Sequence, residues 1–387
     1  MGASLWGCRD AKGFPRRSST FWRGYPVLGV SDVFAVSGAL EVVLEGVAGK
    51  GVMAVVYGST RTSTIPGISI AGPSPEATLY TPTLDIEYLV AGRPLTLDVV
   101  PVSPEGVPTP AVITRAVARA FNIPLLPVDA GSWTEARVPH AKLPSRVTGG
   151  RIDVEPGLPS GASERLFREA YMLGSSLARG LDWIAVGESI PGGTTVAAAV
   201  MEALGYRAAD LVSSSGKDNP RELKKRVVAQ ALSRLRECGA RDVLEIVDCV
   251  GDPVHVSIAG LAVGAREAGA FVILAGGTQM GAVLAILSRL GMLDPRSTAV
   301  ATTKWIALDR GSSIRGIVES IAPGLTVAAA GFSLEGSRYR GLRMYEEGYA
   351  KEGVGAGGSL VISLLRGAGV REILEAVESE YGRLLGG

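Results

Sequence analysis

One glycine-rich segment near the end of the chain combines a carboxylate with backbone that can approach a ligand closely. It runs from Lys351 to Gly358 and places Glu352 directly before four glycines. Glycine permits positive φ, and the helix that we expect to follow would offer unpaired N–H groups to an anion. A carboxylate held there can take a proton from a bound molecule. We therefore predict that Gly353 and Gly355 contact an anionic substrate and that Glu352 is a general base.

A second segment of this kind follows the strand expected over residues 183–186. Glu188 stands at the end of that strand, where it could bind sugar hydroxyls, and a surface salt bridge is the alternative. The loop after it offers N–H groups and two hydroxyls to a phosphate, or is a tight turn capped by Thr. Its predicted substrate-binding residues are Gly192, Gly193, Thr194 and Thr195.

A third glycine turn follows the strand expected over residues 271–274. It consists of Gly276, Gly277 and Thr278, which we predict to bind substrate. Two glycine turns between strands and helices suggest a ligand with two anionic or polar ends, although either turn could serve packing alone. The run Lys224-Lys225-Arg226 is either a solvated helix face or a phosphate contact.

Apolar runs that alternate with helical segments predict the elements that position these loops. Such alternation indicates a Rossmann-like α/β fold, with a mostly parallel sheet, helices on both faces and a smaller helical part from the chain termini. The expected strands are 32–36, 52–57, 97–102, 124–128, 183–186, 243–247, 271–274, 298–301 and 325–329. The expected helices are 109–121, 163–179, 194–204, 219–237, 253–268, 279–290, 312–321, 359–367 and 370–385.

The domain organisation follows from the same pattern. We expect a loose N-terminal extension over 1–28, an α/β domain over 29–340, and a catalytic loop with helices over 341–387. The segment 65–110 is rich in Pro and Thr and predicts irregular structure at a sheet edge. The Pro- and Gly-rich stretch 144–159 is the best candidate linker.

Composition excludes several classes of protein. The net charge is +1, from 39 basic and 38 acidic residues, so no strong field recruits nucleic acid or an anionic membrane. Three cysteines without C-x-x-C spacing exclude a disulfide framework and fit a reducing cytosol, and only two histidines are present. The N-terminus lacks an apolar core typical of a signal peptide, which favours a cytoplasmic protein.

The segment at Gly353, Gly355 and Gly358 also matches G-x-G-x-x-G formally. A dinucleotide fingerprint should follow an early strand and precede an acid about 20 residues later. The preceding residues 344–349 are polar, so a nicotinamide dinucleotide site is not expected.

The motifs, in this order, resemble the nicotinate-nucleotide:dimethylbenzimidazole phosphoribosyltransferase family of cobamide lower-ligand assembly. The likeness covers about residues 181–365, and the first third is more similar to a less characterised branch of the superfamily. The matching stretches are 187–199, 257–260, 272–277 and 352–356, with 62–69 and 108–116 for the branch.

The resemblance implies a pentosyltransferase that moves 5-phosphoribose from nicotinate mononucleotide to a benzimidazole-like base. It matches Glu352 to the family's proposed base and Lys224, or its neighbour Lys225, to a lysine that reaches the phosphate. It also implies a homodimer and small-molecule substrates, with no cofactor, metal, nucleic acid or membrane partner. Ala275 stands where the better-known branch carries Asp, which separates this chain from that branch at a ribose contact.

Two other functions remain open from the sequence. A nucleotide-binding regulatory protein on the same fold would need the glycine loops and not Glu352. A transferase with a different phosphoribosyl or nucleotide donor would need both.

Overall fold

The structure is a computed structural model that describes residues 32–103 and 105–386 of the 387-residue chain. The expected N-terminal extension and Cys8 lie outside the described residues. Within them, no helix is long and apolar enough to cross a membrane.

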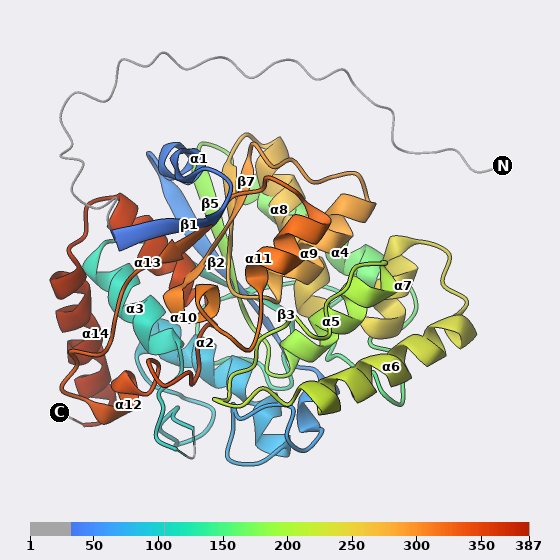
Figure 1. Cartoon of the computed structure of the whole chain (residues 1–387), viewed down its shortest axis with the longest axis horizontal. Coiled ribbons are helices and arrows are strands. Elements are labelled where there is room, and N and C mark those ends of the chain that lie inside the picture. Colours follow the sequence, from blue (N-terminus) through green and yellow to red (C-terminus); the bar gives the residue numbers. More distant parts are fainter. Residues whose placement is uncertain (1–31, 104, 387) are drawn as a thin grey trace.

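Within the described residues, a single eight-stranded sheet organises the molecule (Figure 1). Its order is β1-β8-β7-β6-β5-β2-β3-β4, and every neighbouring pair is parallel except β1 with β8. The strands are β1 (Val33–Ser37), β2 (Gly51–Gly58), β3 (Leu125–Gly131), β4 (Ala141–Lys142), β5 (Trp183–Ser189), β6 (Phe271–Ala275), β7 (Thr298–Thr303) and β8 (Val327–Ala330). The predicted mostly parallel sheet is confirmed.

Side chains alternate between two cores, one on each face of the sheet. In β2, Val52, Ala54 and Val56 pack into one core, whereas Met53, Val55 and Tyr57 pack into the other. Ile184 and Val186 of β5 join the first core. Because both faces are buried, the central strands are near-continuous apolar runs, as expected for parallel strands covered on both sides.

Helices cover both faces, as the sequence predicts. The first core is covered by α4 (Ala162–Leu177), α5 (Gly193–Ala203), α6 (Arg221–Cys238), α7 (Val243–Val250), α8 (Pro253–Glu267), α9 (Met280–Arg289) and α11 (Ile314–Ile321). The second is covered by α1 (Leu40–Gly46), α2 (Thr81–Ala91), α3 (Ala111–Ala120), α12 (Arg340–Arg343), α13 (Ala356–Leu365) and α14 (Val370–Leu384). The short α10 (Lys304–Ala307) follows β7 and contributes to both.

The C-terminal helices dock on the second face through apolar packing and one buried ion pair. Helix α13 packs against β6, β7 and β8, and α14 packs against α3 (Figure 1). The Arg115 guanidinium donates from Nε to Glu380 Oε1 at 2.6 Å, which joins α3 to α14. The division of the chain at residue 340 stays a prediction.

The expected strand 243–247 is wrong, because this segment forms helix α7. The Asp242 carboxylate accepts hydrogen bonds from the N–H groups of Leu244 and Glu245, which caps a helix start. A short apolar run fits a buried strand or a buried helix equally well, and the cap decided between them.

The prediction for the segment 65–110 is also corrected. It contains helix α2, whose first turn holds Pro82, a position that proline favours. Residues 97–102 form no strand; only an isolated bridge joins Val102 to Pro108. Leu97, Val99 and Val100 remain exposed beside the cavity described below.

The stretch 144–159 is not a linker. Ile152 and Leu158 are buried in the first core, and the carbonyl of Gly150 accepts a hydrogen bond from Thr60 Oγ1 at 2.9 Å. Its prolines and glycines therefore shape a packed loop.

Cys238 at the end of α6 and Cys249 in α7 form a disulfide. The expectation of a reducing cytosol did not anticipate this bond, which forms because the chain turns back between the two helices and brings the two cysteines together. Cysteine usage therefore gives no support to a reducing compartment.

Candidate active site

A cavity of about 500 Å³ lies beyond the carboxyl ends of β5 and β6, where open α/β sheets bind ligands. This volume falls within the usual range for small-molecule sites. Residues 188–194, 213–215, 277–279 and 350–354 form its polar walls. Residues 68–73, 97, 99–103 and 107–110 form a largely apolar wall.

Glu352 lies at this cavity, held by backbone groups from two elements. Its Oε1 accepts hydrogen bonds from the N–H groups of Gly353 and Gly357 at 3.1 and 3.0 Å. Its Oε2 accepts from the N–H of Thr303 at 3.1 Å, at the end of β7. The start of α13 and the end of β7 therefore fix the carboxylate in one position.

Gly353 lines the cavity, and its predicted contact with an anionic substrate stays a prediction, but the loop also uses its N–H groups for its own acid. The N–H groups of Gly353 and Gly357, at the start of α13, point at the side chain of Glu352 and not at a ligand. Burial raises the pKa of the Glu352 carboxyl to about 7, although these N–H groups oppose the shift. The backbone of the loop thus binds the carboxylate of Glu352, which belongs to the same loop.

Gly355 does not line the cavity and has a packing role. Its φ is +76°, and a Cβ there would lie 2.4 Å from Cε of Met53. A Cβ on Gly187 of β5 would lie 2.8 Å from Cα of Gly355. The two glycines let the loop cross β5 in backbone contact, which sets the position of Glu352 relative to Glu188.

Glu188 faces the same cavity from the end of β5 and is nearly completely buried. Its Oε2 accepts from the N–H of Ile190 at 3.1 Å, and its Oε1 accepts from Nε2 of Gln279 at 3.1 Å. Burial and the neighbouring charge of Glu352 raise the pKa of the Glu188 carboxyl well above its usual value. The alternative of a surface salt bridge is excluded by its burial.

The loop after β5 lies beside Glu188. Gly192, Gly193 and Thr194 line the cavity, whereas Thr195 is completely buried and does not line it. Gly192 has φ +77°, and a Cβ there would lie 2.9 Å from Cα of Ser63. The turn thus needs glycine for its backbone, and it presents the Thr194 side chain to the cavity.

The turn after β6 contributes Gly277 and Thr278 to the cavity wall, and Gly276 lies behind them against Met280. Thr278 Oγ1 accepts from the N–H of Ser213 at 2.9 Å, so the turn holds the 213–215 segment in place. A Cβ on Gly277 would lie 3.5 Å from Cβ of Glu352.

Two buried lysines lie on the side of the 213–216 segment. Lys224 Nζ donates to Thr194 Oγ1 at 3.2 Å and to the carbonyl of Ser213. It does not line the cavity itself, and its neighbour Lys225 is half-buried and pairs with Asp210. Burial and the charge of Lys351 lower the pKa of Lys224 to about 7.

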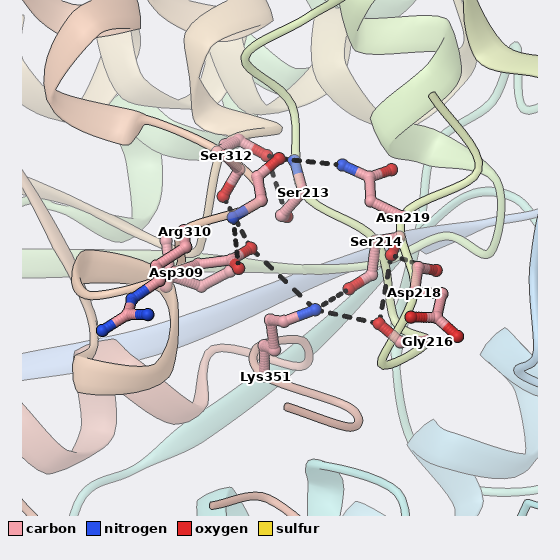
Figure 2. A network of polar contacts seen from close by, with 12 residues as sticks. Ser213, Ser214, Gly216, Asp218, Asn219, Asp309, Arg310, Ser312 and Lys351 are labelled. Atoms are coloured by element: carbon pink, nitrogen blue, oxygen red, sulfur yellow. Dashed lines mark hydrogen bonds and ion pairs between the residues drawn. The ribbon is translucent and has the colours of Figure 1, made fainter. Parts of the chain in front are cut away.

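Lys351 is a site residue that the sequence analysis did not single out. Figure 2 shows its ammonium group directed at the 213–218 segment. Nζ donates to the carbonyls of Ser214 and Gly216 at 3.0 and 2.9 Å, and Asp309 lies 3.9 Å away. Ala350 adds a backbone bond from its N–H to the carbonyl of Ser215 at 2.8 Å.

The backbone around Lys351 is strained. Ala350, Lys351 and Val354 have φ of 56°, 27° and 53°, a region that side chains with a Cβ rarely occupy. Such strain persists only where the surroundings enforce it. Here the contacts of Lys351 and the carboxylate of Glu352 hold the loop from both sides.

Asp85 is a third carboxylate at the cavity and was missed because its segment was expected to be irregular. It lies in α2, nearly buried, and accepts from Thr109 Oγ1 at 2.6 Å and Ser189 Oγ at 2.8 Å. Burial raises the pKa of the Asp85 carboxyl to about 6 against these hydrogen bonds. The proline in the first turn of α2 was the available signal for this helix.

The cavity is therefore polarised. Lys351 and, behind Thr194, Lys224 lie towards the 213–216 segment, while Asp85, Glu188 and Glu352 place carboxylates in the same wall as the glycine loops. The wall formed by Leu97, Val99 and Val100 is apolar. An elongated molecule with an anionic end, a polar middle and a flat apolar end would match these three environments.

Comparison with known proteins defines the class first. A family model described as "Phosphoribosyltransferase" matches residues 111–292. The fold is similar to the crystal structure of CobT from Thermus thermophilus, with a TM-score of 0.59 at 20% identity and 84% of each chain covered. A nicotinate-nucleotide-dimethylbenzimidazole phosphoribosyltransferase from the same organism gives a TM-score of 0.58 at 20% identity, covering 86% of this chain and 89% of that one.

Sequence relatives then place the chain more narrowly. It is 46% identical over 334 residues to a "UPF0284 protein" of Pyrobaculum calidifontis, which covers 86% of this chain and 96% of that protein. A "UPF0284 protein" of Archaeoglobus fulgidus is 41% identical over 342 residues, covering 88% and 96%. The chain belongs to the UPF0284 family, and its residues 111–292 are similar to the phosphoribosyltransferase model. The resemblance inferred from the sequence motifs is confirmed.

Proposed function

We propose that this phosphoribosyltransferase moves 5-phosphoribose from nicotinate mononucleotide to a ring nitrogen of a benzimidazole-like base, with Glu352 as the general base. The observation that carries the proposal is the position of Glu352. Its carboxylate is fixed in the wall of the same cavity as Thr194, Lys351 and Glu188. A base is most effective when its pKa lies near the working pH, and burial raises the pKa of Glu352 to about 7.

The proposed reaction needs two bond changes at C1′ of the ribose. The bond to the cationic pyridine nitrogen breaks, and its electron pair leaves with nicotinate. The bond to the azole nitrogen forms, and the N–H proton of the azole passes to Glu352. Carboxylates at the middle of the cavity stabilise the positive charge that develops on the ribose.

The environments of the cavity support the placement of the two substrates. The phosphate binds at the end of Thr194, Lys351 and Lys224, where Gly192 and Gly193 bring backbone close. Glu188 accepts hydrogen bonds from the ribose hydroxyls. The flat acceptor base lies against the apolar wall of Leu97, Val99 and Val100, with Asp85 at its edge.

The direct test is turnover by the purified chain. Incubation with nicotinate mononucleotide and 5,6-dimethylbenzimidazole should release nicotinate and yield a ribazole phosphate, both followed by chromatography. The rate should fall as the pH drops through about 7, because protonated Glu352 cannot accept the azole proton. A panel of other nucleotide donors tests the alternative of a different phosphoribosyl donor.

Calorimetry with nicotinate mononucleotide separates this proposal from a regulatory protein. Tight binding without product for any benzimidazole acceptor would contradict the proposal and support regulation. The homodimer and the cytoplasmic location expected from the sequence stay predictions.

A further inference from the structure

The apolar wall of the cavity includes a strap of chain, residues 97–103, that is open to solvent. Leu97, Val99 and Val100 line the cavity and are 39%, 46% and 47% exposed. Among the described residues, the N–H groups of 97–102 hydrogen-bond only to carbonyls within this stretch, at 3.0 and 2.8 Å. The strap therefore has little support along its length, and its position depends on how its two ends are held.

The first end of the strap is held by the carboxylate of Glu87 in α2. Its Oε2 accepts from the N–H groups of Leu95 and Thr96 at 2.6 and 2.7 Å, and its Oε1 accepts from Thr96 Oγ1 at 2.6 Å. Oε1 also accepts from the N–H of Arg137 at 2.9 Å, in the loop after β3. One side chain thus joins α2, the residues before the strap and the loop after β3.

The four donors around Glu87 indicate that its carboxyl group is ionised. The side chain is completely buried and does not line the cavity. Burial alone would raise the pKa of the Glu87 carboxyl, but its hydrogen bonds to Thr96, Arg137 and Leu95 outweigh this effect and lower the pKa. Hydrogen bonds to an ionised acceptor are stronger than neutral ones, so this end of the strap is firmly fixed.

The second end of the strap is held through Asp85, two residues earlier in α2. The N–H of Ser103 donates to the carbonyl of Val107 at 2.8 Å, and the N–H of Thr109 donates to the carbonyl of Pro101 at 3.0 Å. Thr109 Oγ1 then donates to Asp85 Oδ1 at 2.6 Å. The same helix therefore holds both ends of the strap, and the exposed apolar side chains lie between them.

We propose that Glu87 is a positioning residue that sets the apolar wall of the cavity and thereby determines the affinity for the acceptor base. The identity of the acceptor rests on the proposed function. A flat apolar base in the cavity covers the exposed surface of Leu97, Val99 and Val100, and this burial favours binding. Because ordering a loose strap on binding would cost conformational entropy, a strap that is already fixed binds the base more tightly.

The competing explanation is that Glu87 only stabilises the fold. Loss of the side chain would then not discriminate between the two substrates, whereas a misplaced strap weakens binding of the acceptor and not of the donor. Glu169 in α4 provides a matched control with the same kind of contacts. It accepts from the N–H and the hydroxyl of Ser145 at 2.8 and 2.6 Å, on the other face of the sheet and away from the cavity.

Hydrogen exchange followed by mass spectrometry tests the role of Glu87 without any substrate. In Glu87→Gln an amide NH₂ would face an N–H donor, so residues 95–103 should exchange about 10-fold faster than in the unmutated chain. Thr96→Val removes only the hydroxyl bond and should cause a smaller change in the same direction. Glu169→Gln should leave the exchange of this segment unchanged.

The Thr96→Val variant keeps this test decisive if Glu87→Gln does not fold. Unchanged exchange of residues 95–103 in every variant of Glu87 and Thr96 that melts cooperatively would overturn the proposal.

Steady-state kinetics test the consequence for substrate affinity. At saturating nicotinate mononucleotide, Glu87→Gln should raise KM for 5,6-dimethylbenzimidazole about 10-fold and leave KM for the donor unchanged, and Glu169→Gln should alter neither. An unaltered acceptor KM, or an equal rise in both KM values, would refute the role in acceptor affinity. If the unmutated chain shows no transfer, the proposed function fails, and the exchange of residues 95–103 still decides whether Glu87 holds the strap.

Discussion

The two glycine-rich segments of the site, 187–195 and 352–358, have similar compositions and use their backbone differently. In 352–358 the N–H groups of Gly353 and Gly357 bind the carboxylate of Glu352 within the same loop. In 187–195 the turn at Gly192 and Gly193 lines the cavity, with Thr194 backed by Lys224. One segment positions a base, and the other can hold an anion from outside. Glycine content alone does not distinguish these roles; the charged side chain nearest each loop does.

The largest effect should come from removing the base. Glu352→Gln should lower kcat by roughly 10²–10⁴-fold, the usual contribution of a general base. Both oxygens of Glu352 accept N–H groups, so an amide NH₂ would face a donor and also cost about 1–3 kcal/mol of stability.

The control for this variant is Glu347→Gln, an exposed glutamate five residues earlier, which should retain full activity. Donor affinity measured by calorimetry separates lost chemistry from lost binding. Full turnover by folded Glu352→Gln would show that Glu352 is not the base.

A smaller effect is expected from separating the two segments. Gly187→Ala adds a Cβ 2.8 Å from Cα of Gly355, so the 352–358 loop must move away from β5. Overpacking of this kind costs about 1–3 kcal/mol, and displacement of a catalytic group by about 1 Å can lower the rate about 10²-fold.

Gly336→Ala is the matched control for Gly187→Ala. Gly336 is exposed and has no positive φ, and its added Cβ would meet only a side-chain atom of Leu374 at 3.7 Å. Gly187→Ala should have a lower melting temperature and a lower initial rate than Gly336→Ala. Equal stability and activity of the two variants would contradict the tight loop crossing.

The anion-binding segment is tested by its two adjacent lysines. Lys224→Met removes the ammonium group behind Thr194 and should raise KM for nicotinate mononucleotide about 10-fold, equivalent to about 1.4 kcal/mol. Lys225→Met removes a half-buried charge that is paired with Asp210 away from the cavity, and it should leave KM unchanged. An increase in KM for Lys225→Met alone would indicate that the phosphate binds at the outer face of α6.

Most of the sheet could be predicted from the sequence because its strands are buried on both faces. The runs 52–57, 183–186 and 271–274 are short, apolar and followed by glycine-containing turns, and each became a parallel strand. The run 243–247 has the same apolar character and became α7, since the cap from Asp242 made the helical choice. The helix cap therefore determined the secondary structure of this run, because its apolar pattern fitted a strand and a helix equally well.

The site was predictable only where one segment carries its own signal. Glu352, Glu188 and the turn at Gly192 and Gly193 lie in glycine-rich loops at the cavity, as expected. Asp85 is placed at the cavity by a contact with Ser189, about a hundred positions away in the sequence, which no local pattern shows. Lys351 stood beside Glu352 in the same motif, yet its contacts depend on the path of the 213–216 segment.

The last prediction concerns stability and not turnover, and it tests the carboxylate side of the cavity. Because the folded-state pKa of Asp85 is raised from 3.8 to about 6, the folded chain binds more protons than the unfolded chain between these values. The contribution of Asp85 to stability is therefore fully present below the lower pKa and is lost as the pH rises through about 6.

Asp85→Asn removes this titration and keeps a side chain of the same shape between Thr109 and Ser189. The stability of the variant relative to the unmutated chain should rise by on the order of 1–3 kcal/mol from about pH 4 to about pH 7. Glu188 and Glu352 titrate in both proteins, so their contributions largely cancel in the difference. Urea unfolding at both pH values measures it, with Asp98→Asn, an exposed aspartate, as the control. A relative stability that does not change with pH would mean that Asp85 is not held as a desolvated acid, and the acidic wall of the cavity would then reduce to Glu188 and Glu352.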